Sequence, residues 1–244
     1  MADLYSNTND GNVYSSTLAA WADARDDTTG HAVATGINSA AAFVAAYRFA
    51  ARGGGNAYRV LRSFMYFDTS GISGTVSSAT IKLYGFSSGT DGSIIAVKST
   101  AFGGDGATAL AVEDLDAITG YSTGASLAGN ATDYSNTILA GSWNASGYND
   151  LTGTEDLRAD MQNNDVVIIC FMDYTNDYLN SALTSNVNLD CGGYYTDNSG
   201  TSKDPYITYE VATGYGNIVS GVAAANIGKV DGVATANIEK VIGV

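Results

Sequence analysis

The residues able to do covalent chemistry are few in this chain and widely separated. His31 is its one histidine, and in a Gly/Thr turn context we expect it to face solvent. A Ser/His/Asp triad would depend on that residue, and one histidine with two dispersed cysteines argues against a zinc site. The sequence therefore predicts a protein that is not an enzyme and holds no cofactor and no metal.

Carboxylates are plentiful but form no recognisable catalytic pattern. Glycoside hydrolysis needs two carboxylates at a defined separation, and the sequence does not pair its glutamates (Glu113, Glu155, Glu210 and Glu239). A structural calcium ion in the Asp-rich loop with Asp105, Asp114 and Asp116 lacks EF-hand spacing. A polysaccharide-cleaving enzyme remains the second alternative, and calcium is not favoured.

Aromatic residues in the expected loops suggest a different activity, sugar binding. Sugar rings stack on exposed aromatic faces, while nearby polar side chains bond to the hydroxyls. The candidates are Trp143, Tyr148, Tyr174, Tyr178, Tyr194 and Tyr195. The competing and favoured interpretation is that these rings simply cover strand surfaces.

Composition indicates a folded, acidic β-protein. The 244 residues are 45% hydrophobic, which suffices for a core, and acids outnumber bases 25 to 11 for a net charge of −14. That charge repels DNA and anionic membranes, so we expect no nucleic-acid partner and no membrane partner. The 29 glycines, 16 tyrosines and single proline suit turns and solvent-facing strands.

Apolar and aromatic runs, some of them alternating with polar residues, predict the strands. The expected strands are 62–68, 78–86, 93–98, 165–172 and 205–211. In the second, Ala79, Ile81 and Leu83 share one face, and Thr80, Lys82 and Tyr84 the other. We expect one shared core containing Phe67, Ile81, Leu83, Val97, Ile169 and Ile207.

Other segments are less regular. Residues 39–52 carry helix-favouring alanines but alternate with period two, and we interpret them as a strand that ends in a turn at Gly53–Gly55. A short helix should follow the N-cap Thr154, and another is a candidate at 109–117. Residues 136–143 are a possible strand, and 103–129 and 173–190 are long polar loops. We expect Cys170 to be buried and not bridged to Cys191.

A family resemblance supports this architecture. The stretch Arg62-Ser63-Phe64-Met65-Tyr66-Phe67-Asp68-Thr69-Ser70, then Ser78-Ala79-Thr80-Ile81-Lys82-Leu83-Tyr84, resembles the disaggregatase-related (DNRLRE) domain. Segments 165–171 and 203–211 look like the family's central and closing strands. The resemblance covers roughly residues 1–212 and implies a jelly-roll-like antiparallel β-sandwich, a carbohydrate-binding-like module, over that range.

Residues 213–244 form a separate repeat tail. Gly-Val recurs every eleven residues at 221, 232 and 243, and Asn-Ile recurs at 226 and 237. The sequence Val230-Asp231-Gly232-Val233 is typical of a hairpin turn. This repeat array is too short to bury its apolar residues alone. We therefore expect it to serve attachment or oligomerisation. The assembly residues would be Ile218, Val222, Ile227, Val230, Val233, Ile238, Val241 and Val244.

The opening residues 1–11 and the repeats resemble proteins encoded by tailed phages. This resemblance implies a virion location, and release by host lysis would fit the absence of a recognisable targeting segment. We therefore expect a phage structural protein, either a capsid decoration or a tail or fibre component, with other virion proteins and sister chains as partners. The first alternative is an adhesin for host-surface glycans.

Overall fold

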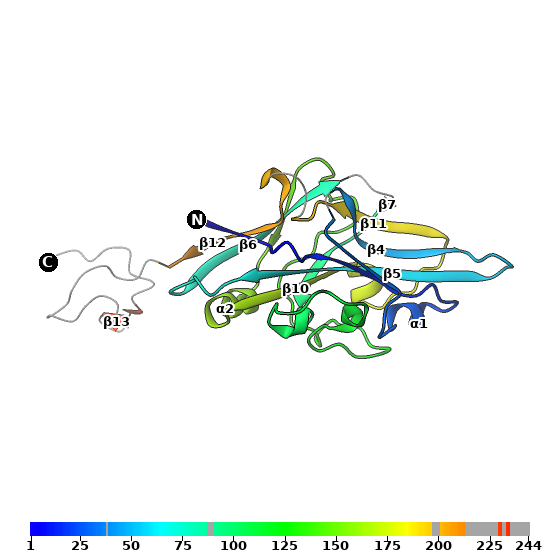
Figure 1. Cartoon of the computed structure of the whole chain (residues 1–244), viewed down its shortest axis with the longest axis horizontal. Helices are drawn as coiled ribbons and strands as arrows, with labels where there is room; N and C mark the ends of the chain where they lie inside the picture. Colours follow the sequence, from blue (N-terminus) through cyan, green and yellow to red (C-terminus); the bar gives the residue numbers. More distant parts are fainter. Residues whose placement is uncertain (38, 87–89, 197–200, 213–228, 231–232, 235–244) are drawn as a thin grey trace.

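The chain is an all-β protein dominated by antiparallel strands, and its computed structural model describes residues 1–37, 39–86, 90–196, 201–212, 229–230 and 233–234. Two sheets pack face to face as a β-sandwich (Figure 1). The strands are β1 (Ala2–Tyr5), β2 (Gly11–Tyr14), β3 (Ala32–Thr35), β4 (Ala41–Ala50), β5 (Asn56–Asp68), β6 (Val76–Phe86), β7 (Thr90–Asp91), β8 (Ile95–Lys98), β9 (Tyr148–Thr152), β10 (Val166–Met172), β11 (Val187–Gly193) and β12 (Tyr206–Val211).

The smaller layer, called sheet A here, contains β1, β12, β6 and β9 in that order. Its central strand β6 alternates as the sequence predicts: Ile81 and Leu83 are buried, whereas Lys82 and Tyr84 lie on the other face. The first strand of the domain pairs with the last, with Ala2 opposite Tyr209. The two ends of the domain are therefore joined within one sheet.

The larger layer, called sheet B, is organised around β5, the longest strand with 13 residues. The first half of β5 pairs with β4 and the second half with β10, while β2 pairs across the join on the other edge. Strand β8 extends the sheet beyond β10, and β11 extends it beyond β4. Gly192 and Gly193 of β11 also pair with the end of β6, which connects the two sheets.

The core between the sheets contains most of the residues expected there. Strands β5, β10 and β6 direct their alternate residues into it, and the buried members include Phe67, Ile81, Leu83, Ile169 and Ile207, as predicted. Phe43 of β4 packs against Phe171, with ring centroids 5.2 Å apart. Apolar burial on this scale is the main force that holds the two layers together.

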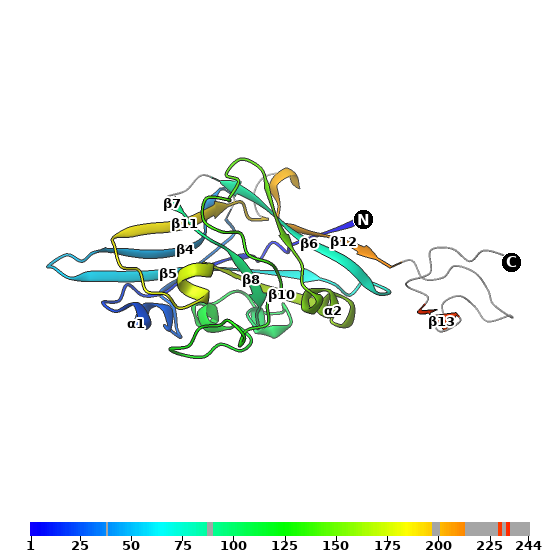
Figure 2. The same ribbon diagram turned by 180° about the vertical axis from the view of Figure 1, so that it is seen from behind.

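Sheet B is also covered on its second face, which the sequence analysis did not anticipate. Helix α1 (Trp21–Arg25) and the segment 101–131 lie against it and form a covering layer, seen with α1 and the green ribbon in Figure 1 and from behind in Figure 2. Ile168, Cys170 and Met172 point into this second core, between the residues that face sheet A. Val97 lies there too, so the prediction that it shares the inter-sheet core is wrong.

Several local predictions are confirmed. Residues 41–50 are strand β4, not a helix, and the turn that follows uses Gly53, Gly54 and Gly55 at positive φ. Helix α2 (Glu155–Asn163) starts after Thr154, whose hydroxyl accepts a hydrogen bond from the Leu157 amide. The helical candidate at 109–117 is a 3-10 helix at Val112–Asp116.

Two other local predictions are wrong. Residues 136–143 form no strand and make a single bridge, between Ile138 and Ile94. The expected loop 173–190 begins with a π-helical turn (Tyr174–Tyr178) and ends inside β11. In strand β11, Val187 and Leu189 pack against the second core and alternate with Asn188 and Asp190, and the strand pairs with β4 along its length.

The cysteines and the repeats complete the comparison with the sequence. Cys170 and Cys191 are buried in different cores and are not bridged to each other. Within the repeats, β13 (Lys229–Val230) pairs antiparallel with β14 (Val233–Ala234), with Val230 opposite Val233, as expected for the hairpin. The other assembly candidates lie outside the described residues: Ile218, Val222, Ile227, Ile238, Val241 and Val244.

Candidate binding surface

An aromatic ladder crosses the outer face of sheet A. Neighbouring ring centroids along it are 5.1 to 6.3 Å apart. The ladder consists of Tyr5 of β1, Tyr206 of β12, Tyr148 of β9, Tyr84 and Phe86 of β6, and Tyr194, which follows β11. The rings come from segments far apart in the chain, and strand pairing places them side by side.

The alternation of each strand explains why these rings face outward. Leu4 and Ile207 pack toward the inter-sheet core, so the adjacent Tyr5 and Tyr206 must point to the opposite face. The same holds for Tyr194 beside the buried Tyr195. The ladder is therefore a direct consequence of the register that fills the core.

The ends of the ladder are open and its middle is supported. Tyr5 is 45% exposed and Phe86 42% exposed, whereas the rings between them are half-buried. Most neighbouring rings meet edge to face, an arrangement that aromatic quadrupoles favour. Burial, followed by the neighbouring Tyr206 and Tyr5 hydroxyls, raises the pKa of Tyr148 to about 12, so this ring stays neutral at physiological pH.

Polar groups border the ladder. The Lys203 ammonium lies 4.2 Å from the centroid of the Tyr194 ring and 5.3 Å from that of Tyr84, a cation–π geometry. Lys82, on the same face of β6, forms an ion pair of 2.5 Å with Asp150. Cationic and carboxylate groups thus lie beside aromatic rings, the combination that recognises a polyhydroxylated ring.

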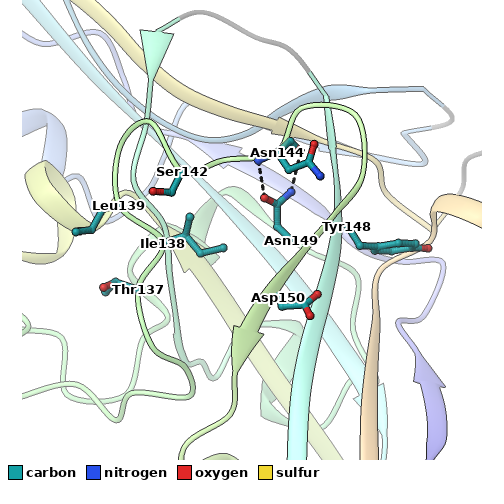
Figure 3. Close-up of a pocket in the computed structure, with 8 residues that line it drawn as sticks. All are labelled: Thr137, Ile138, Leu139, Ser142, Asn144, Tyr148, Asn149 and Asp150. Carbon is teal, nitrogen blue, oxygen red and sulfur yellow. Dashed lines mark hydrogen bonds between the residues drawn. The ribbon is translucent and has the colours of Figure 1, made fainter.

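A shallow pocket of about 490 Å³ lies next to Tyr148 (Figure 3). One wall is β9, and the other is the irregular segment that includes Thr137, Leu139 and Ser142. The Asn149 side chain fixes this segment, because it accepts from the Asn144 amide at 2.7 Å and donates to the Asn144 carbonyl at 2.9 Å.

Gly85 of β6 is needed for the same contact. A Cβ atom at this position would lie 1.9 Å from the Asn144 carbonyl oxygen. The glycine lets the segment approach sheet A closely, and the pocket forms on its solvent side.

The structure separates the six predicted sugar-binding residues. Tyr148 and Tyr194 belong to the ladder. Trp143 is half-buried and packs against the inter-sheet core. Its indole N–H donates to the Gly192 carbonyl at 3.0 Å, which ties the pocket segment to β11. Tyr174, in the π-helical turn that completes the covering layer, stacks on Tyr178 at 5.5 Å and is not part of the ladder.

Two of the six are removed from the candidate set because their rings do not face solvent. Tyr178 is 3% exposed, and its hydroxyl donates to Asp133 at 2.8 Å. Tyr195 is fully buried between the layers and bonds to Ser63 and Asn12. A buried ring with a satisfied hydroxyl serves packing.

Sequence reasoning missed four members of the ladder: Tyr5, Tyr84, Phe86 and Tyr206. A signal was present, since Tyr84 shares the polar face of its strand and Tyr206 precedes the buried Ile207. What the sequence lacks is the strand order that brings β1, β12, β6 and β9 together. Lys203 was missed for the same reason.

A second cluster of charged side chains is buried beneath the covering layer. The Arg62 guanidinium forms a two-point contact with Asp177, at 2.7 Å for each oxygen, and both side chains are fully buried. It also donates to the carbonyls of Leu115 at 2.7 Å and Arg25 at 2.9 Å. Arg62 thereby ties β5 to α1, to the segment 101–131 and to the π-helical turn.

Tyr121 completes this cluster. Its ring lies 5.3 Å from both the Arg25 and the Arg62 guanidinium carbons, and its hydroxyl donates to Asp26 at 2.9 Å. The charge of Asp177 and its hydrogen bonds outweigh the effect of burial, so the pKa of Arg62 is raised and the group stays charged. The Arg-Ser-Phe motif at 62–64 thus has a structural role: it anchors the covering layer.

One catalytic motif can be assessed on the structure. Residues 120–124 read Gly-Tyr-Ser-Thr-Gly and match the pattern of a nucleophile elbow. An elbow needs a strand-to-helix turn, whereas Ser122 lies exposed in an irregular part of the covering layer, and the Gly124 amide donates to Asp26 at 2.8 Å. His31 is exposed, as predicted.

Metal and membrane features were searched in the same way. Within residues 1–212, apart from the gaps given above, and the short β13–β14 pair, no group of three His, Cys, Asp or Glu side chains is placed to bind a metal. Asp105 and Asp114 instead accept hydrogen bonds from the amides of Ala107 and Ala111 at 2.9 Å. In this same part of the chain, no helix has the length and apolarity of a membrane span.

Comparison with known proteins adds no family assignment. No protein-family model matches this chain, and no curated protein matches its sequence.

Proposed function

We propose that the protein is a non-enzymatic structural protein of a bacteriophage particle. In this proposal the β-sandwich is displayed on the particle and the repeats after residue 212 attach it. The observation that carries the proposal is the closure of the sandwich: β1 pairs with β12, and the Ala212 amide donates to the Thr75 carbonyl at 2.8 Å. Within the described residues, the first and last strands of the sandwich are therefore joined before the repeats begin.

The use of the buried charges supports a structural role. Arg62 and Asp177 anchor the covering layer, and Asp173 accepts hydrogen bonds from Ser93 and Asn176 that fix the turn after β10. Such groups, satisfied by internal partners, stabilise a fold and are not poised to react.

Removal of the repeats tests the proposal. A chain that ends at Tyr215 should keep the circular dichroism spectrum and unfolding temperature of the sandwich but lose attachment to particles. Mass spectrometry of purified particles should detect the full-length protein, with many copies for a capsid decoration and few for a fibre. Absence from particles, or equal attachment of both chains, would contradict the proposal.

The aromatic ladder favours a second candidate function, adhesion to host-surface glycans. The rings of Tyr5 and Phe86 are exposed to solvent, and Lys203 and Asp150 lie beside the ladder. Stacking on several sugar rings in a row suits an extended polysaccharide. A displayed sandwich with such a face would bring the particle to the cell surface.

A glycan array separates adhesion from a purely structural role. Wild-type protein should bind one or more bacterial polysaccharides, and Tyr148→Ala should weaken the binding at least about tenfold, equivalent to about 1.4 kcal/mol. Tyr174→Ala is the matched control, because that ring lies in the covering layer. Release of reducing ends from a bound polysaccharide would instead favour a cleaving enzyme.

A further inference from the structure

The hairpin of β4 and β5 concentrates positive charge in an acidic protein. Arg48, Arg52 and Arg59 lie on it, and residues 28–67 contain no Asp or Glu, although the chain has 25 acids. In both views the hairpin projects from one end of the sandwich (Figures 1 and 2). We call these three residues the arginine arm.

The arm is held in place without being neutralised. Among the described residues, none of the ion pairs involves its three arginines. Arg59 lies over the rings of Tyr14 and Tyr47, at 5.3 and 5.4 Å, and Arg48 lies 5.9 Å from the Tyr58 centroid. Stacking of this kind orients a guanidinium while its charge remains available.

The turn of the hairpin adds an exposed cation and an apolar ring. Arg52 is exposed beside the triple glycine, and Phe49 is 37% exposed. The nearby acid is Asp190 of β11, whose charge, after burial, contributes to raising the pKa of Tyr47 to about 12. Asp190 pairs with Ala45, in the middle of β4, so the tip around Arg52 stays cationic.

The opposite end of the same strand is acidic. β5 runs from Asn56 to Asp68, and at about 3.3 Å per residue its ends are roughly 40 Å apart. Helix α2 and the end of β12 lie at that far end in Figures 1 and 2. The exposed acids there, called the acidic end, are Asp68, Glu155, Asp156, Asp165 and Glu210.

We propose that the arginine arm of one copy docks on the acidic end of a second copy, in a head-to-tail association. Oriented guanidiniums form two-point contacts with carboxylates, and complementary charge sets both partner choice and orientation. A long anionic polymer is a poorer occupant because it would also run past the acidic remainder of the surface, whereas a second copy presents the exposed carboxylates of its acidic end in one place. The arm and the acidic end are different surfaces, so the contact can repeat.

Two substitutions with the same change of net charge test this contact in the full-length chain. Arg52→Glu removes charge from the arm and should weaken self-association at least tenfold in sedimentation at about 0.1 M NaCl. Arg158→Glu, on α2 beside Glu155, makes the acidic end more acidic and should leave association unchanged or tighten it. Raising the salt to about 1 M should weaken the wild-type association, because the Debye length falls to about 3 Å.

Charge exchange provides the complementary test. Glu155→Lys alone should weaken association, and a mixture of Arg52→Glu with Glu155→Lys protein should recover it as mixed pairs. Unfolding temperatures identical to wild type would exclude a folding defect, since both sites are exposed.

Four results would overturn the proposal. The first three are equal effects of Arg52→Glu and Arg158→Glu, failure of the mixture to associate, and a wild-type chain that stays monomeric at about millimolar concentration. Association that ignores both salt and these variants would also overturn it. That last outcome would assign association to the repeats and leave the proposed attachment function intact.

Discussion

The two outward-directed faces of the sandwich are used in opposite ways. The outer face of sheet A is open to solvent and carries the aromatic ladder, with Lys82 and Lys203 beside it. The outer face of sheet B is covered by α1 and residues 101–131, and its charged residue Arg62 is fully buried. Aromatic rings on the open face remain available to a ligand, whereas polar groups on the covered face bond to one another inside the protein.

In such a protein, a binding site is expected on the open face and not on the covered one. The strongest electrostatic feature, the Arg62–Asp177 pair, lies at the covered face and serves stability. The ladder carries little charge, yet it is the surface that another molecule can reach. The predictions below test this division, beginning with the largest expected effect.

Loss of Arg62 should have the largest effect. Arg62→Ala leaves Asp177 buried without its two-point partner, and removal of one member of a buried pair typically costs about 3–5 kcal/mol. Lys82→Ala is the control on the open face, because an ion pair exposed to water contributes about 0–1 kcal/mol. Urea unfolding of both variants measures the difference, and equal losses would contradict the comparison.

Adjacent residues of β10 test whether both faces of sheet B are covered. Ile169 points to sheet A and Ile168 to the covering layer, and they are 0% and 4% exposed. Each substitution by alanine should cost about 2–5 kcal/mol of unfolding free energy. In a simple two-layer sandwich, only Ile169→Ala would lower the unfolding free energy by this amount. A small effect of Ile168→Ala would therefore contradict the presence of the covering layer.

The open face should tolerate change. Tyr206→Ala removes the edge contact with Tyr148 and the tilted ring contact with Tyr5, and it should cost about 0.5–1.5 kcal/mol beyond the lost burial. Urea denaturation measures this, and a slope of unfolding free energy against urea concentration equal to that of wild type would show that the fold persists. Unfolding of the variant at room temperature would mean that the ladder is a structural element.

The smallest effect should appear at Asp160 and should depend on pH. Burial raises the pKa of this carboxyl, but hydrogen bonds from Lys98, at 2.8 Å, and from Tyr134 outweigh it, so the pKa is lowered. A lowered pKa gives stability that is fully present above the unfolded value of about 3.9 and is lost as pH falls through the folded value.

Asp160→Asn should therefore cost about 1 kcal/mol at neutral pH and progressively less below about pH 4. Thermal unfolding of both proteins from neutral to acidic pH measures this. A deficit that stays constant over the range would show that the carboxylate charge contributes nothing.

Sequence patterns predicted the strands that carry a strong apolar signal of their own. Strand β6 alternates apolar and polar residues, whereas β10 is a continuous apolar run, and Thr154 has the hydroxyl that a helix start requires. Strand β11 has a weaker signal, because Val187 and Leu189 alternate with Asn188 and Asp190 but the strand then ends in Gly192 and Gly193.

The ladder and the covering layer escaped prediction for a common reason. The position of Val97 is an example. Ile94 and Ala96 face the inter-sheet core, so Val97 points to the other side of sheet B, which is also covered. The continuous apolar run of β10, Val166–Met172, is the local signal of a strand covered on both faces, but it does not tell which segment covers the second face. The rings of the ladder come from separate segments, so only strand order reveals them.

Ring-labelled tyrosine NMR of the full-length protein tests the division between the faces most directly. Spectra would be compared with and without the bacterial oligosaccharide that gives the strongest array signal. The account predicts shifted signals for Tyr84, Tyr148, Tyr194 and Tyr206, and unchanged signals for the covered Tyr178 and buried Tyr195. Shifts confined to Tyr174 and Tyr178, with the ladder unchanged, would contradict it.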